Sequence, residues 1–303
     1  MRKTRIGGAF AGIAIAALAL TACAGGTPGG TPGGDGDGDG DTNETPWSVA
    51  TDVTLEGSPT FDAMTSRGTI NIGVKEDQPG LGYLDPTTSE RTGFDVDVAR
   101  WMAASLGFDE DDIDFTTIPS ANREQALING DIDLYVGTYS ITDKRKEQIS
   151  FAGPYFITGQ GLLVAADSDI TGVDSIDGKN ICSATGSTSI QRIRDDHPEA
   201  ETTEFDTYSQ CVEQLKAGQV DAVTTDEAIL IGYAAGDPDN LKVVGEVFSE
   251  ERYGIGIPKG DTALLEHLNT TLTDGGDIWQ AIFDKNLGAS GVTATQPEVD
   301  PVG

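Results

Sequence analysis

An alternation of strand-like and helix-like segments begins near Thr60 and continues almost to the end of the chain. Short apolar runs such as Ile70 to Val74 have the character of buried strands, whereas residues from Phe94 to Leu106 place apolar side chains on one helical face. This rhythm predicts an α/β protein. The alternating part spans roughly 230 residues, which is long for one lobe and natural for two. We expect strands over residues 69–74, 113–118, 132–136, 160–164, 180–182, 203–205 and 221–224, and helices over 94–106, 123–129, 187–194, 208–216, 263–272 and 278–287.

The first 23 residues have the composition of a secretory signal. Three positive charges precede an apolar stretch from Ile6 to Leu20, which is shorter than the about 20 residues that a membrane-spanning helix needs. The following L-T-A-C resembles the lipobox of bacterial lipoproteins, in which the Cys is acylated and becomes the mature N-terminus. The resemblance implies a signal peptide over residues 1–22 and a diacylated Cys23. Two acyl chains would hold the exported protein at the outer face of the cytoplasmic membrane.

Residues 24–46 consist almost entirely of Gly, Pro, Thr and Asp. Such a composition cannot bury a core, so we interpret residues 23–59 as a lipidated Cys followed by a flexible tether. The Asp residues that alternate with Gly at 35–41 suggest calcium ligands at first sight. They lack the mixed ligand set and the closing Glu of a calcium-binding loop. We therefore expect a charged spacer and no metal site.

Three Cys are present in the chain, and the lipidation motif uses one of them. Cys182 and Cys211 remain, in a protein expected to work outside the cytoplasm. An even pair in an oxidising compartment favours a disulfide, and two buried free thiols are the alternative.

The overall composition argues against several functions. The net charge is −31, which excludes nucleic acid as a partner. The two His lie in no recognisable motif, and we find no phosphate-binding loop, no Gly-x-Ser-x-Gly and no metal-ligand spacing. We expect no catalytic residue, no enzyme activity and no cofactor.

The stretch from Gly137 to Phe156, GTYSITDKRKEQISFAGPYF, has the chemistry of a carboxylate-binding turn. It follows an apolar run and begins with hydroxyl side chains, after which Arg145 lies in a basic patch. A guanidinium presents a planar fork to two carboxylate oxygens, and hydroxyls and turn amides can hydrogen-bond to the remaining lone pairs. On residue chemistry alone, a solvated turn with surface basic residues is an equally good interpretation.

The same stretch resembles solute-binding protein family 3, the polar amino-acid-binding proteins of ABC importers. The segments K-E-D-Q-P-G-L-G, P-S-A-N-R-E, T-Y-S-I, I-C-S-A-T-G-S-T and D-T-Y-S-Q-C are most similar to the glutamate-binding lipoproteins of Gram-positive bacteria. The likeness covers roughly residues 67–290, with several motifs in order. It implies a protein that binds a free amino acid and delivers it to the transmembrane permease subunits.

The resemblance also implies a two-lobed, type II periplasmic-binding-protein-like fold with a hinged ligand cleft. We expect lobe one to comprise residues 60–154 and 257–290, lobe two 160–251, and a tail 291–303. Two crossover strands near 155–159 and 252–256 would act as the hinge. In such sheets, ligands collect at strand carboxyl ends and helix N-termini.

Five site residues follow from the family pattern. Arg145 is expected to pair with the ligand's α-carboxylate beside the hydroxyl of Ser140. The main chain of Thr138 would contact the α-ammonium. From lobe two, Thr188 would give an amide and a hydroxyl to the carboxylate, and Asp226 would pair with the ammonium. An α-amino acid that bridges Arg145 and Asp226 would close the cleft.

Two departures from the family pattern bear on ligand choice. The turn from Lys75 to Leu81 has no aromatic residue where many relatives carry one, and Ser120 occupies a position where Phe is common. The cations Arg123 and Lys75 in this region suit a side-chain carboxylate, which predicts glutamate ahead of glutamine, aspartate or asparagine. For Arg123, an ordinary surface position at a helix start is the alternative.

Two other functions fit the same fold. An amino-acid sensor would present the closed form to a receptor instead of a permease. A secreted dehydratase, such as a cyclohexadienyl dehydratase, would need a general acid against a cyclic substrate, and the sequence offers only scattered carboxylates for that purpose.

The anchor can be tested with Cys23→Ser. Without the acylated thiol, the protein should appear in the medium or remain as an uncleaved precursor, because a single polar side chain gives no membrane affinity. Partitioning into the detergent phase measures the change. Partitioning equal to that of the unsubstituted protein would contradict the lipobox interpretation.

Overall fold

The computed structural model describes residues 45–301, and these residues belong to one compact unit. The predicted signal peptide, Cys23 and the tether up to residue 44 lie outside the described residues. None of the described helices combines the length and the apolar character needed to cross a membrane.

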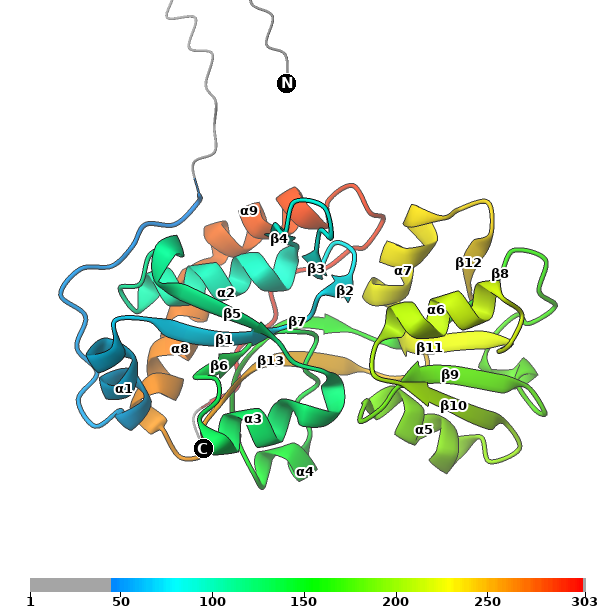
Figure 1. The fold of residues 1–303 in the computed structure, drawn as a ribbon, viewed down its shortest axis with the longest axis horizontal. Coiled ribbons are helices and arrows are strands. Elements are labelled where there is room, and N and C mark those ends of the chain that lie inside the picture. The colour runs from blue at the N-terminus through cyan, green and yellow to red at the C-terminus, as the bar shows by residue number, and fades with distance from the viewer. Residues whose placement is uncertain (1–44, 302–303) are drawn as a thin grey trace, which may run out of the picture. The chain divides into compact units, whose positions relative to one another are not determined.

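The first lobe is built on a five-stranded sheet with the order β5-β1-β6-β13-β7 (Figure 1). β1 pairs in parallel with β5 and β6, whereas β13 is antiparallel to β6 and β7. A small antiparallel sheet, β2-β3-β4, adjoins it. The strands are β1 (Ile70–Val74), β2 (Asp77–Gln78), β3 (Gly82–Leu84), β4 (Arg91–Thr92), β5 (Ile113–Thr117), β6 (Leu134–Tyr135), β7 (Ser150–Thr158) and β13 (Glu251–Ile257).

The second lobe contains a five-stranded sheet with the order β10-β9-β11-β8-β12. β9 pairs in parallel with β10 and β11, and β8 is antiparallel to β11 and β12. The strands are β8 (Gln160–Ala165), β9 (Asn180–Ala184), β10 (Glu201–Phe205), β11 (Ala222–Asp226) and β12 (Leu241–Val244).

Helices cover both faces of each sheet, with α2 and α9 above the first sheet and α3 and α4 below it in Figure 1. In the second lobe, α6 and α7 lie above the sheet and α5 below it. The helices are α1 (Pro59–Arg67), α2 (Phe94–Ser105), α3 (Arg123–Asn129), α4 (Asp143–Lys146), α5 (Thr188–Asp196), α6 (Tyr208–Lys216), α7 (Glu227–Gly236), α8 (Thr262–Asp274) and α9 (Gly276–Asn286), with 3₁₀ turns at Glu110–Asp112, Ser120–Asn122 and Val173–Ser175.

Side-chain caps fix where the two helices nearest the cleft begin. The Ser187 hydroxyl accepts a hydrogen bond from the amide of Ile190 and so starts α5. Thr207 and Gln210 form a reciprocal capping box at the start of α6. Such caps satisfy amides that have no partner within the helix.

Aromatic side chains dominate the core of the first lobe. Phe94, at the start of α2, packs against Phe156 and Trp279 with ring centroids 5.3 and 5.7 Å apart. The indole N–H of Trp279 donates to the carbonyl of Tyr155 at 2.7 Å. This packing joins α2, α9 and β7 around one apolar centre.

The structure confirms the predicted α/β class and most of the expected elements, including α3 and α6 at their predicted bounds. The strand expected over 132–136 pairs only at Leu134–Tyr135. Sequence analysis missed α7 because its sequence, EAILIGYAAG, is apolar on nearly every face and has no helical alternation.

The chain passes twice between the two sheets. β7 ends at Thr158 in the first sheet and β8 begins at Gln160 in the second, so the first crossover falls at Gly159. β13 belongs to the first sheet from Glu251 onward. The second crossover is therefore residues 245–250, a few residues before the predicted Arg252–Gly256.

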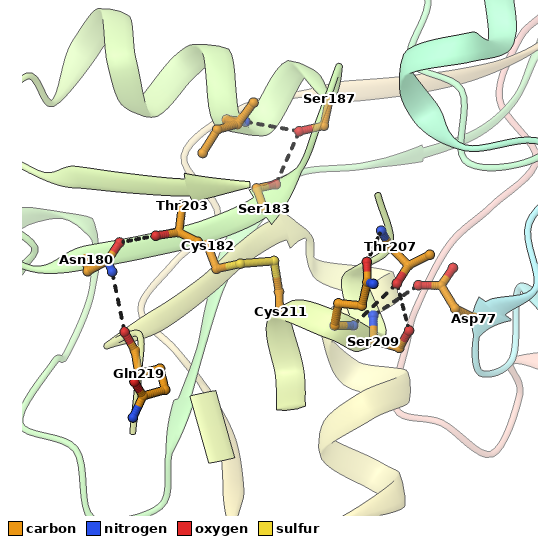
Figure 2. The surroundings of a disulfide bond; sticks show 12 residues. Asp77, Asn180, Cys182, Ser183, Ser187, Thr203, Thr207, Ser209, Cys211 and Gln219 are labelled. Carbon is orange, nitrogen blue, oxygen red and sulfur yellow. Dashed lines mark hydrogen bonds between the residues drawn. A yellow bond between two sulfur atoms is a disulfide. The ribbon is translucent and has the colours of Figure 1, made fainter. Parts of the chain in front are cut away.

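Cys182 in β9 and Cys211 in α6 form a disulfide with their Cα atoms 5.6 Å apart (Figure 2). Both residues are fully buried, in an apolar cluster that includes Leu163, Val223 and Leu230. The bond ties a central strand of the second sheet to the helix that covers it.

Removal of this disulfide should lower the free energy of unfolding. The two Cys are 29 residues apart, and chain-entropy models give roughly 3–4 kcal/mol for a loop of that size. Urea unfolding of a Cys182→Ser/Cys211→Ser variant would measure the loss. Two free thiols in non-reducing peptide maps of native protein would show that the bond does not form.

Candidate ligand-binding site

Three cationic side chains are buried in the first lobe where it faces the second. Lys75, Arg123 and Arg145 are only 4%, 2% and 7% exposed. The ammonium of Lys75 donates to the hydroxyl of Ser120 at 2.7 Å. Burial and the charge of Arg123 lower the pKa of Lys75 to about 7. Burying three cations in one region costs free energy unless anionic or polar groups pair with them.

Arg145 reaches across to the second lobe. Its guanidinium donates to the carbonyl of Ser140 at 2.7 Å and to the carbonyl of Gly186, in the second lobe, at 3.1 Å. Nε contacts Glu124 at 3.1 Å. Thr142 caps the short helix α4 by accepting from the Arg145 backbone amide. Burial and the neighbouring Arg123 lower the pKa of Arg145.

Arg123 is a buried residue, not a surface residue at a helix start. Its guanidinium donates to the carbonyl of Ser120 at 3.0 Å and to that of Thr138 at 3.4 Å. The ring of Tyr139 lies under it, with 4.2 Å from the guanidinium carbon to the ring centroid. Within residues 45–301, Arg123 forms no ion pair with a carboxylate.

Thr138 forms a constrained turn between these cations. Its φ is 45°, which is uncommon for a residue with a side chain. The amide donates to Asp95 at 2.9 Å, and the hydroxyl accepts from Gln78 at 3.1 Å. Asp95 also accepts from the Tyr155 hydroxyl at 2.8 Å. Burial raises the pKa of Asp95 to about 6.

Asp226 provides the buried anion of the second lobe, at the end of β11. It is 4% exposed, and Oδ2 accepts from the hydroxyl of Tyr253 at 2.7 Å. Burial first, and then the charge of Glu251, raises the pKa of Asp226 to about 7. Arg123 and Arg145 lower that pKa, so the cations of the first lobe act on the anion of the second.

Thr188 opens α5, and its hydroxyl donates to Glu251 Oε2 at 3.2 Å. The hydroxyl proton is therefore directed to Glu251 and not toward a ligand carboxylate. Ser140 contributes its carbonyl to Arg145 and forms a bridge with Tyr253. The predicted site residues are therefore buried or half-buried, and each has a hydrogen-bond or bridge partner in this part of the molecule.

Four buried side-chain atoms in residues 45–301 have no hydrogen-bond partner, and they lie in this part of the molecule. They are Gln78 Oε1, the Tyr139 hydroxyl, Thr225 Oγ1 and Asp226 Oδ1. Gln78 donates to Thr138, Tyr139 stacks on Arg123, and Thr225 precedes Asp226. Because buried polar atoms are nearly always paired, these four atoms are candidate contacts for a polar ligand.

Sequence reasoning missed several members of the site. Tyr208, in the quoted D-T-Y-S-Q-C segment, is buried, and burial together with the charge of Asp226 raises its pKa to about 12. Tyr139 packs its ring against the guanidinium groups of both Arg123 and Arg145. Asp95 and Gln78 orient Thr138. Asp95 and Asp97 both lie in the first turn of α2, and this pair is the sequence feature that could have pointed to Asp95.

The two lobes touch on the other side of this group. The carboxylate of Asp77 accepts from the Ser209 amide at 3.0 Å (Figure 2). It also accepts from the Tyr233 hydroxyl at 3.2 Å. A groove of about 660 Å³ lies between α4 and α5, and it is lined by Arg145 and Thr188 but not by Lys75, Arg123 or Asp226. These three charges lie deeper than the groove. In the described part of the chain, no cluster of His, Cys, Asp or Glu has the arrangement of a metal site.

The two sheets, the double crossover and the polar group between the lobes define a periplasmic-binding-protein-like fold of type II. The chain belongs to the bacterial extracellular solute-binding proteins, family 3, whose profile matches residues 70–288.

Relatives of known specificity cover most of the chain. It is 42% identical to the glutamate-binding protein GluB of Corynebacterium efficiens, over 77% of this chain and 83% of that protein. It is 41% identical to a glutamine-binding protein of Geobacillus stearothermophilus, over 72% of this chain and 83% of that protein. An ancestral arginine-binding protein bound to arginine superposes with a TM-score of 0.69 at 34% identity, covering 73% of this chain and 99% of that one.

Asp226→Asn should make the ligand-free protein more stable at neutral and alkaline pH. The folded state favours the protonated carboxyl, so ionisation of Asp226 destabilises the fold. This penalty is absent below pH 4 and grows as pH rises toward 7. A pKa change from 3.8 to about 7 corresponds to roughly 4 kcal/mol at most. The facing groups are Glu251, Tyr253, Tyr208, Arg123 and Arg145.

Urea unfolding of both proteins at pH 4.5 and pH 8 would measure this effect. The stability difference should be small at pH 4.5 and larger at pH 8. An equal difference at both pH values would contradict the assigned ionisation cost.

Proposed function

We propose that the protein captures a polar amino acid, glutamate in first place, between its lobes and delivers it to an ABC permease. One observation carries the proposal: buried cations of the first lobe oppose a buried carboxylate of the second, and that carboxylate has an unpaired oxygen. The family consists of solute-binding proteins and not of enzymes.

The charges of Arg145 and Asp226 are opposite to those of the α-carboxylate and the α-ammonium, which all amino acids share. Arg145 is the cation for the α-carboxylate, and Asp226 Oδ1 is the acceptor for the α-ammonium. A zwitterion would supply a counter-charge to each of them in a dry site, where charge-assisted hydrogen bonds are strong. Because the two residues come from different lobes, the ligand would stabilise the closed arrangement.

The side-chain end of the proposed site is cationic. Arg123 has no carboxylate partner within the described residues, and the nearby Lys75 donates to Ser120. A γ-carboxylate would pair with both cations, whereas a neutral amide offers only one acceptor oxygen. Glutamate- and glutamine-binding relatives at 42% and 41% identity support this range of ligands.

Export and anchoring belong to the same proposal. The family is extracellular, and we infer that Cys23 is acylated and holds the binding domain at the outer face of the cytoplasmic membrane, close to its permease. Calorimetry of the soluble domain with glutamate, glutamine, aspartate, asparagine, arginine and histidine tests the binding function. Binding of none of these amino acids would refute it.

Arg145→Ala should weaken the binding of every amino acid by at least about 30-fold, because truncating one member of a buried charge pair costs ~2–5 kcal/mol. Calorimetry on the folded variant measures the loss. Lys144→Ala is the matched control, since it removes a neighbouring, exposed cation. Near-normal binding by the Arg145 variant would show that the α-carboxylate lies elsewhere.

Arg123→Ala should weaken glutamate binding more than glutamine binding, by roughly 1–3 kcal/mol, the range for a charge-assisted hydrogen bond. Affinities of both ligands for both proteins give the difference directly. Equal losses for the two ligands, or a preference of the unsubstituted protein for a basic amino acid, would refute glutamate while leaving amino-acid binding intact.

A further inference from the structure

A second buried carboxylate, Glu251, contacts one of the predicted ligand-binding residues, Thr188. It is 3% exposed and is the first residue of β13, just after the second crossover. Oε1 accepts from the Ser249 hydroxyl at 2.9 Å and from Arg192 at 3.2 Å. Oε2 accepts from the hydroxyl of Thr188 at 3.2 Å.

The contacts of Arg192 extend this group to the first crossover. Arg192 Nε donates to the side-chain oxygen of Gln160 at 3.1 Å. The side-chain amide of the fully buried Gln160 donates to the carbonyl of Ser189 at 3.0 Å and to the hydroxyl of Thr224 at 2.9 Å. Gln160 is the first residue of β8. The first turn of α5 is thus tied to the residues that follow both crossovers.

The start of α5 is also where the second lobe meets Arg145. The carbonyl of Gly186 accepts from that guanidinium at 3.1 Å. Gly186 lies so close to the first lobe that an added Cβ would stand 2.7 Å from the Cα of Ala121. A small displacement of this turn would therefore change the geometry at Arg145.

We propose that Glu251 is a positioning residue that holds the first turn of α5 in place through Thr188 and Arg192. The backbone amides of that turn then face the ligand carboxylate bound by Arg145. The role rests on the proposed amino-acid-binding function. In this role, the Thr188 hydroxyl binds Glu251, and the Thr188 backbone amide remains available to the ligand. A charged acceptor buried with its donors fixes their directions more firmly than a neutral one.

The charge of Glu251 has a second consequence, at Asp226. After burial, Glu251 is the largest cause that raises the pKa of Asp226, while Tyr253, Arg123 and Arg145 lower it. Tyr208 also faces this carboxyl. Removing the charge of Glu251 should therefore lower the pKa of Asp226 and let it accept a ligand ammonium at lower pH.

The test is calorimetry of Glu251→Gln, which keeps the shape of the side chain and removes its charge. We expect affinity to fall about tenfold for glutamate and glutamine alike, the size of one lost charge-assisted hydrogen bond. Binding should weaken on acidification as Asp226 takes up a proton, and we expect the pH midpoint of that loss to be lower in the variant. The affinity loss tests the hold of Glu251 on α5, and the shift of the midpoint tests the effect of its charge on Asp226.

Arg194→Gln is the matched control on the same helix. Arg194 pairs at the surface with Glu204 and has no contact with the Glu251 group, so affinity and pH midpoint should stay unchanged. An unchanged affinity or an unshifted midpoint in Glu251→Gln would overturn the inference.

A second variant keeps the inference testable if Glu251→Gln fails to fold. Thr188→Val keeps the backbone amide but loses the hydroxyl that contacts Glu251, so it should lose several-fold in affinity. Binding equal to that of the unsubstituted protein would overturn the inference. Binding of no amino acid by the unsubstituted protein would instead refute the proposed function.

Discussion

The burial of opposite charges on the two sides of the lobe interface is the constraint on which the site depends. Lys75, Arg123 and Arg145 are withdrawn from water on one side, and Asp226 on the other. Desolvation moves the pKa of both Lys75 and Asp226 to about 7, which shows how poorly the protein alone stabilises these charges. In the function that we propose, a zwitterionic ligand would supply the missing counter-charges, and its binding would be coupled to closure of the two lobes.

The surrounding fold is arranged to keep these groups in fixed directions. In the first lobe, Asp95 holds the turn at Thr138, whose carbonyl accepts from Arg123. In the second lobe, Glu251 and Gln160 hold the first turn of α5. Both supports are buried hydrogen-bond networks, and networks of this kind orient the groups that contact a ligand directly. We therefore expect the orientation of these groups to be fixed before a ligand binds.

The sequence predicted the α/β class and most elements because strand and helix periodicities are local properties. It also predicted the pairing of Cys182 with Cys211, which the structure contains. Tyr208 and Glu251 were out of reach because their importance comes from tertiary neighbours far along the chain. The hydroxyl of Thr188 illustrates the same limit, since its partner Glu251 is 63 residues away.

A crystal structure of the domain grown with glutamate at neutral pH tests the central claim most directly. The account predicts the α-carboxylate at hydrogen-bonding distance from Arg145 and the ammonium against Oδ1 of Asp226. The side-chain carboxylate should face Arg123 and Lys75. Glutamate bound in the reverse direction, or outside the group formed by these residues, would contradict the account.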